Sequence, residues 1–178
     1  MRAAIVHVNS AHQSPARRRG IALVELALVV PFLLILVFGM VDFGRFLISR
    51  NKITNLSREA ANLASRETPF LDTLHAIFAA SGSLDLQQNG FVILTQVERD
   101  QNGNRVITKQ ASDGGEPHAS HIGTLGGVPN LPGSTNLPQA GQILMVAEVF
   151  LKYEPVTPLG ELIDDGMPRV LYDVAYFY

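Results

Sequence analysis

The chain of 178 residues contains no cysteine. Without a thiol it can form neither a disulfide nor a zinc–thiolate centre, and it has no cysteine nucleophile. The absence excludes three common kinds of stabilising or catalytic site. It leaves the redox state of the protein's compartment open.

Positive charge is scarce in the distal part of the chain. Residues 67–178 carry five basic and thirteen acidic side chains, a net charge of −8, whereas residues 1–20 carry four arginines and no acid. Proteins gain affinity for nucleic acids by neutralising phosphates with Lys and Arg, and the chain shows no interleaving of aromatic and basic residues. We therefore expect no nucleic acid partner.

Catalytic motifs are missing as well. No serine lies in a Gly-x-Ser-x-Gly context, and the kinase-like triplet at 42–44 (Asp-Phe-Gly) has neither a catalytic loop nor a β3 lysine upstream. His118 and His121, with Glu116 nearby, have a spacing that could bind a metal, but they lie in a polar loop without a further ligand. We expect no catalytic residue, no metal and no cofactor, and hence a protein that is not an enzyme.

One long apolar run stands out in the N-terminal part. Residues 21–41 include a single ionisable side chain, that of Glu25. As a helix they would rise roughly 31 Å, which matches the hydrocarbon core of a bilayer. The run is longer than the apolar region of an ordinary cleaved signal and no small-x-small site follows it. It predicts a transmembrane helix that stays in the protein as an anchor.

The residues before this run are basic and polar. Arg17, Arg18 and Arg19 precede Gly20, and residues 1–20 show no sustained helical or alternating period, which is typical of an irregular leader or cytoplasmic tail.

Charge counting does not orient the span, because four basic residues also follow it within twenty positions: Arg45, Arg50, Lys52 and Arg58. Placement decides instead, since three arginines adjoin the start of the run and Asp42 adjoins its end. We predict a cytoplasmic N-terminus and an extracytoplasmic C-terminal domain.

The helical pattern continues beyond the membrane segment. Pro31 removes one backbone donor within the span and predicts a kink there. At 42–66 apolar residues recur at helical spacing, and Thr68 before Pro69 ends the pattern. One helix over 21–66 would be roughly 70 Å long, with half in lipid and half exposed outside it.

The distal region, 67–178, mixes helical and strand patterns. The expected elements are a short helix at 70–81, a hairpin of 91–97 and 105–109 around an Asn-Gly turn, and strands at 142–153 and 170–178. Between them, 111–141 holds seven glycines and four prolines and predicts a long loop or an excursion over a surface. The fold class is α+β: a small, mostly antiparallel sheet packed on the exposed half of the long helix, as in pilins.

Glu25 admits two interpretations. A carboxylate near the bilayer centre costs about 2.5–3.5 kcal/mol on insertion scales, so an ionisable residue there is a functional hypothesis that requires a partner. Alternatively, it lies within about one turn of the interface and extends its carboxylate to the headgroups at little cost. Periodicity does not distinguish the two.

Two parts of the sequence resemble a known family. Residues 17–31 (RRRGIALVELALVVP) and 39–45 (GMVDFGR) are similar to the N-terminal region of TadE-like proteins, the pseudopilins of the tight-adherence (Flp) pilus system in the type IV pilin class. Residues 146–149 and 153–159 resemble the C-terminal part of the same family. Residues 68–141 carry no such resemblance.

The resemblance implies a specific processing chemistry. In this class a prepilin peptidase of the bacterial inner membrane cuts after the glycine, here between Gly20 and Ile21. The new α-amino group of Ile21 would then pair with Glu25 of an adjacent subunit and set the register of the assembling helices.

The implied partners are the prepilin peptidase, a pilus secretion ATPase with its membrane platform, a companion pseudopilin and the pilin, in a system that serves secretion-type assembly and cell adhesion. The implied location is the inner membrane, as a single-pass protein with a periplasmic domain that could enter the pilus. An alternative is a signal-anchored periplasmic binding or scaffold protein unrelated to pili, in which the leader is kept.

Overall fold

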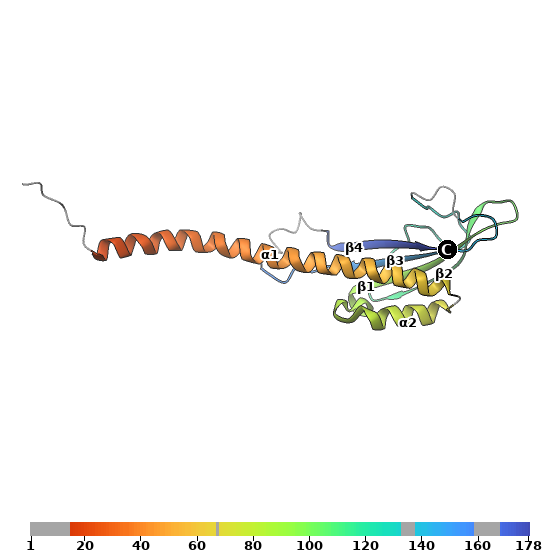
Figure 1. The fold of residues 1–178 in the computed structure, drawn as a ribbon, viewed down its shortest axis with the longest axis horizontal. Coiled ribbons are helices and arrows are strands. Elements are labelled where there is room, and N and C mark those ends of the chain that lie inside the picture. The colour runs from red at the N-terminus through yellow and green to blue at the C-terminus, as the bar shows by residue number, and fades with distance from the viewer. Residues whose placement is uncertain (1–14, 67, 133–137, 159–167) are drawn as a thin grey trace, which may run out of the picture.

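The structure, a computed structural model, describes residues 15–66, 68–132, 138–158 and 168–178, with side chains from Gly20 onward. It is an α+β fold in which one long helix leads into a small domain at its far end (Figure 1). The predicted fold class is confirmed.

Helix α1 spans Pro15–Ser65 without interruption. Its 51 residues rise roughly 77 Å. The expectation of irregular chain up to residue 20 is wrong for 15–20, because Pro15 suits the first position of a helix and the following alanine and arginines are good helix formers. α1 also continues through Pro31. The kink at Pro31 stays a prediction.

Three short helical elements follow α1. They are α2 (Phe70–Ser81), the 3-10 turn η1 (Gly82–Leu84) and α3 (Leu86–Asn89). α2 coincides with the helix expected at 70–81. Its residues Leu74 and Ile77 are buried, as the apolar spacing requires.

The sheet has four strands in the order β2-β1-β3-β4, and every neighbouring pair is antiparallel. Their bounds are β1 Gly90–Arg99, β2 Arg105–Gly114, β3 Leu144–Lys152 and β4 Val170–Phe177. In the β1–β2 turn the Asp100 carboxylate accepts the amide of Asn102 at 2.9 Å and that of Asn104 at 2.7 Å. The loop predicted to start at 111 therefore starts later, since residues 111–114 pair with 91–94 as part of β2.

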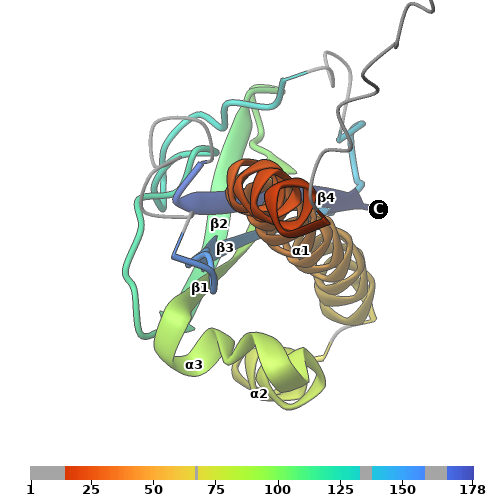
Figure 2. The same cartoon turned by 90° about the vertical axis from the view of Figure 1, so that its left-hand side faces the viewer.

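The two faces of the sheet are covered differently. On β3, Ala147, Val149 and Leu151 belong to the core against the helices, whereas Leu144 and Val146 belong to a second cluster on the opposite face. Viewed along α1, that helix lies over β3 and β4, with α2 beside it (Figure 2). The sheet is therefore the middle layer of the domain.

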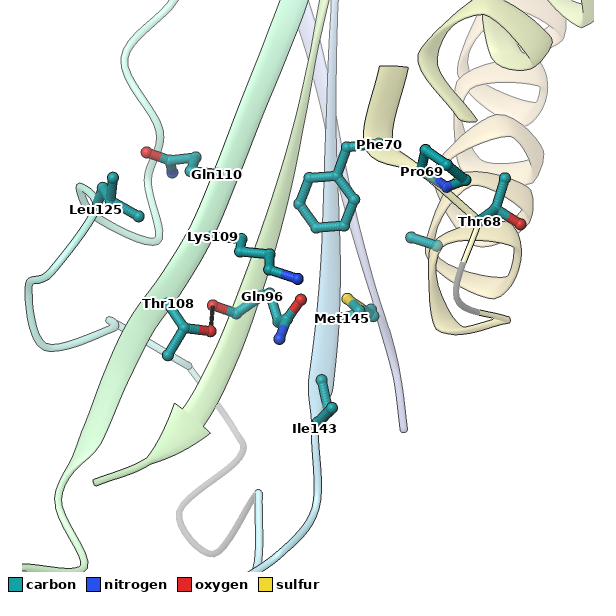
Figure 3. A pocket seen from close by; sticks show the side chains of 11 residues that line it. Thr68, Pro69, Phe70, Gln96, Thr108, Lys109, Gln110, Leu125, Ile143 and Met145 are labelled. Atoms are coloured by element: carbon teal, nitrogen blue, oxygen red, sulfur yellow. Dashed lines mark hydrogen bonds between the residues drawn. The ribbon is translucent and has the colours of Figure 1, made fainter. Parts of the chain in front are cut away.

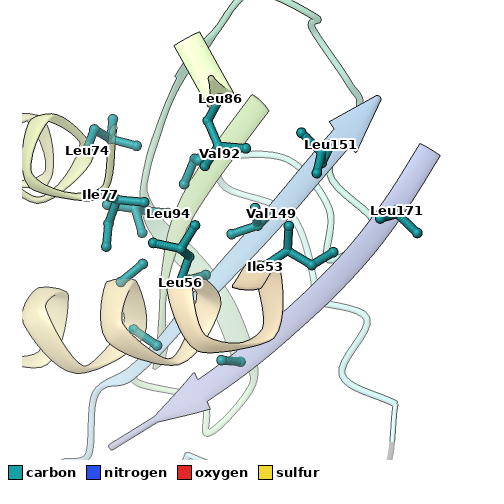
Figure 4. Close-up of a cluster of buried hydrophobic side chains, with 14 of the residues drawn as sticks. Ile53, Leu56, Leu74, Ile77, Leu86, Val92, Leu94, Val149, Leu151 and Leu171 are labelled. Carbon is teal, nitrogen blue, oxygen red and sulfur yellow. The ribbon is translucent and has the colours of Figure 1, made fainter. Parts of the chain in front are cut away.

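The main core joins both helices to the sheet. Ile53 and Leu56 of α1 and Leu74 and Ile77 of α2 converge on strand residues such as Val149 (Figure 4). Three buried alanines on the α1 face, Ala60, Ala61 and Ala64, allow a close approach of the helix. This packing fixes the exposed half of α1 on the sheet.

The second cluster explains the Gly/Pro-rich segment. Ile122 and Leu131 from this segment are buried against Val97, Ile107 and Leu144 of the sheet. Within the described part of 115–132 no helix or strand forms. The segment is thus the excursion over a surface that its composition predicts, and it covers the face that the helices leave open.

Candidate functional site

The predicted processing residues lie on one exposed stretch of α1. Gly20, Ile21 and Glu25 are all solvent-exposed, and with Val24 and Leu28 they line one shallow groove along the helix. A Cβ added to Gly20 would meet no heavy atom within 4 Å. The fold therefore has room for a larger side chain at this position, so packing does not explain the glycine.

The bond between Gly20 and Ile21 is inside the helix and not in a loop. A protease that needs extended substrate must therefore open the helix locally. Glycine lowers that cost, because it is about 1 kcal/mol less favourable than alanine in a helix interior. Of Arg17, Arg18 and Arg19 the structure describes only the backbone, which belongs to α1.

Glu25 is exposed on α1. Among the side chains described, from Gly20 onward, none forms a hydrogen bond or ion pair with its carboxylate. Ile21 is one helical turn away on the same face, so the residue that would carry a new amino group and the acid lie side by side. Ile21 and Glu25 are thus neighbours on one face of α1, as the spacing predicts. Both side chains are exposed and remain accessible to another molecule.

The apolar run is a candidate membrane span. No part of its most apolar window is buried against the rest of the protein. Large side chains such as Leu28, Phe32 and Met40 are 69–75% exposed. An isolated helix that is apolar on all sides needs lipid or other helices around it. By length and composition, α1 is a helix that could cross a membrane.

A second constellation lies where the span ends. Asp42, the first residue after the run, is buried in spite of its charge, with 1% of its surface exposed. One carboxylate oxygen accepts the amide of Val156 at 3.0 Å and that of Thr157 at 3.2 Å, and the other accepts the Thr157 hydroxyl. The hydroxyl of Tyr153 donates to the Asp42 carbonyl at 2.8 Å.

These contacts keep Asp42 charged. Burial raises the pKa of its carboxyl, but the hydrogen bonds from Thr157 and Val156 and the nearby Arg45 outweigh it, so the pKa lies below its usual value of 3.8. Tyr153 also packs edge-on against Phe46, with ring centroids 5.4 Å apart. We call residues 42–46 and 153–157 the exit collar, because residues 153–157 pack against one side of α1 just past the end of the apolar run.

Sequence reasoning missed the collar. Asp42 marked only the end of an apolar run, and residues 153–159 carried a family resemblance without a location. Both strings were already singled out by that resemblance. What could not be seen was that chain segments more than a hundred residues apart meet there.

A buried carboxylate on the loop-covered face was missed too. Glu148 of β3 is fully buried and accepts hydrogen bonds from the His121 amide at 2.8 Å, the Tyr172 hydroxyl at 3.1 Å and the Ser120 hydroxyl. Burial and the Glu148 charge raise the pKa of Tyr172. Glu148 therefore ties the covering loop to two strands.

The histidines considered as metal ligands have another role. The ring of His118 stacks on Phe150 at 4.7 Å between centroids, and that of His121 packs against Phe150 and Tyr172. Across the described ranges, no three His, Cys, Asp or Glu side chains gather into a group that could hold a metal ion.

A groove opens near the end of α1 that is furthest from the span. It encloses about 670 Å³ and is lined by side chains of mixed character: Ala64, Thr68, Pro69, Phe70, Gln96, Thr108, Lys109, Gln110, Leu125, Ile143 and Met145 (Figure 3). Phe70 and Met145 form its apolar wall. Gln96 and Lys109 are the register neighbours of Met145 on β1 and β2, so the three side chains lie side by side on the sheet.

The fold and these sites define a class: a protein with one candidate membrane span whose helix continues unbroken onto a four-stranded antiparallel sheet, the arrangement of pilin-like subunits. Residues 20–62 match the sequence model of the family described as TadE-like protein, so the predicted resemblance is confirmed over that segment. No match is found among curated proteins or among solved structures.

Proposed function

We propose that the protein is a minor pilin or pseudopilin that takes part in assembly of the tight-adherence (Flp) pilus. It is held in the inner membrane by α1 and cut by a prepilin peptidase after Gly20. The observation that carries the proposal is the extent of the TadE-like match, which begins at Gly20 and runs along α1 as far as residue 62. The segment in common thus starts at the residue next to the proposed cut.

The cut would create a positively charged amino group that can pair with the Glu25 carboxylate. Opposite unit charges about 4 Å apart attract by roughly 1 kcal/mol in water and roughly 4 kcal/mol at an effective dielectric of 20. The amino group of Ile21 on one subunit would pair with Glu25 on the next. Exposure of both residues supports this pairing, since nothing in the described chain covers them.

The proposed role is structural and involves no catalysis by this chain. Its partners are the prepilin peptidase, the secretion ATPase with its membrane platform, a companion pseudopilin and the pilin. The N-terminus is cytoplasmic and the sheet domain periplasmic. The sheet domain makes the subunit bulkier than a bare helix, which favours a minor or assembly component over the bulk pilin.

The test is the intact mass and N-terminal sequence of the protein isolated from membranes of a host with an active prepilin peptidase. We expect a chain that begins at Ile21. Gly20→Val should retain Met1, because a branched side chain obstructs access to the backbone, whereas the fold has room for it. A wild-type chain that still begins at Met1 would overturn the proposal and favour a signal-anchored scaffold protein.

A further inference from the structure

The loop at 155–158 is held against α1 at the residue where the apolar run has just ended. Its amides bond to Asp42, which is one helical residue past the apolar run, and a residue rises only about 1.5 Å along a helix. If α1 spans the bilayer to Val41, as in the proposed function, the loop is at the membrane interface. The Asp42 contacts fix the position of the loop relative to α1.

The backbone of this loop has no unsatisfied donor. Pro155 and Pro158 have no N–H, and the amides of Val156 and Thr157 both donate to Asp42. The Thr157 hydroxyl donates to the same carboxylate. In lipid an unpaired N–H costs several kcal/mol, so internal pairing of its donors lowers the cost of placing this loop at the membrane interface.

The side chains fit the same environment. Val156 is 62% exposed and Pro158 is exposed, and residues 155–158 carry no charge. The preceding charges, Glu154 and Lys152, pair with each other at 3.2 Å just outside the loop. An apolar tip bordered by charged residues is the pattern of a segment that rests in the headgroup region.

We propose that residues 155–158 form a second membrane contact, with Val156 and Pro158 inserted among the headgroups and upper acyl chains of the lipid bilayer. Asp42 is the internal acceptor that makes insertion possible. α1 is then not the sole attachment of the domain. Two contacts at different distances from the helix axis fix the rotation of the sheet domain relative to the membrane.

The absence of cysteine allows a direct test with single-cysteine variants of the full chain. Val156→Cys is labelled with a polarity-sensitive fluorophore and reconstituted into phosphatidylethanolamine–phosphatidylglycerol vesicles that contain spin-labelled quenching lipids. We expect a blue-shifted emission and the loss of most fluorescence with shallow quenchers. Weaker quenching is expected with deep ones.

Two matched sites make the result decisive. Val128 is 77% exposed and lies beside the β1–β2 turn, roughly 30 Å along β1 from the collar, so Val128→Cys should stay unquenched. Leu33→Cys, within the span, should respond to deep quenchers. Quenching at Leu33 with none at Val156 would overturn the second contact alone. No quenching at Leu33 would overturn the span, and with it the proposed function.

The role of Asp42 is tested in the Val156→Cys background. Asp42→Asn replaces an acceptor oxygen by a donor and should reduce quenching of the Val156 label, and Thr157→Val, which removes one of three bonds, should reduce it less. Circular dichroism checks that each variant keeps its helix and sheet. Undiminished quenching in a folded Asp42→Asn protein would overturn the role of the carboxylate.

Discussion

Asp42 shows how much a single side chain organises in this protein. Its carboxylate satisfies three donors from residues 114 and 115 positions further along the chain, at a point where water is scarce. A buried charge is tolerated only when hydrogen bonds replace its hydration. The residue therefore closes the fold at the edge of the apolar core, next to the core residue Tyr153.

The lowered pKa of Asp42 predicts a pH-dependent stability. A folded-state pKa below the unfolded value stabilises the fold above about pH 4, and the contribution is lost as the pH falls through the folded pKa. Asp42→Asn should destabilise the protein by roughly 1–3 kcal/mol at neutral pH. Its deficit relative to wild type should shrink as the pH falls from about 4 through the lowered folded pKa, because Asp42 then becomes protonated and neutral like the asparagine.

Thermal unfolding of the full chain in detergent micelles, followed by circular dichroism over a pH series, measures this deficit. Glu59→Gln, which changes an exposed carboxylate on the same helix, is the control and should melt like wild type. A deficit for Asp42→Asn that is constant with pH would contradict the assignment of the charged form.

At the scale of elements, local patterns predicted most of the architecture. The 3.6-residue period defined α2, and the Asn-Gly turn at 102–103 located the hairpin. The end of β2 was missed because Ser112 and Asp113 have poor strand propensity. Pairing with Ile93 and Val92 of β1 overrides it.

The sites between elements were less predictable. Glu148 occupies a strand position between apolar neighbours, and nothing local shows that Ser120 and His121 supply its donors. Such a site depends on a loop crossing a particular strand, which periodicity does not encode. That Gly20, Ile21 and Glu25 share one stretch of helix could be predicted because they are close in sequence, whereas their role in processing stays a prediction.

Glu148→Gln tests whether this carboxylate holds the covering loop. The variant keeps the shape but replaces one acceptor by a donor, so it should lower the free energy of unfolding by roughly 1–3 kcal/mol. Amide hydrogen exchange should accelerate in residues 118–131 more than in β1. Glu116→Gln, in the same segment but with an exposed ion pair to Lys152, should change exchange little. Equal acceleration everywhere would indicate general destabilisation instead.

At the scale of the whole molecule, the two halves of α1 have opposite surroundings. The distal half is packed on β3 and β4, whereas the half at 21–41 touches nothing else in the described chain that buries it. The membrane half therefore has its full surface available to lipid and to other subunits. Glu25 is the single charge on that surface.

Glu25→Ala should separate membrane insertion and processing from pilus assembly. Processing after Gly20 and membrane insertion should remain largely intact, because neither the cut bond nor the apolar run is altered. Pilus formation should fall sharply, since the partner for the new amino group is lost. Immunoblots of membrane fractions follow processing, and electron microscopy of surface pili follows assembly.

Glu25→Asp is the control for this experiment. It keeps the charge on a shorter side chain and should restore part of the piliation. Normal piliation in Glu25→Ala cells would remove the pairing from the proposed mechanism, and failure of processing would show that the acid acts before the cut.

The unbroken course of α1 from the apolar run to the sheet has a mechanical consequence. No linker separates the anchor from the domain, and the exit collar holds the chain at Asp42, the first residue past the apolar run. A continuous helix passes rotation and axial movement of the anchor on to the sheet, because no flexible segment lies between them. In the proposed function, an assembly machine that contacts only the anchor would therefore also orient the sheet domain outside the membrane.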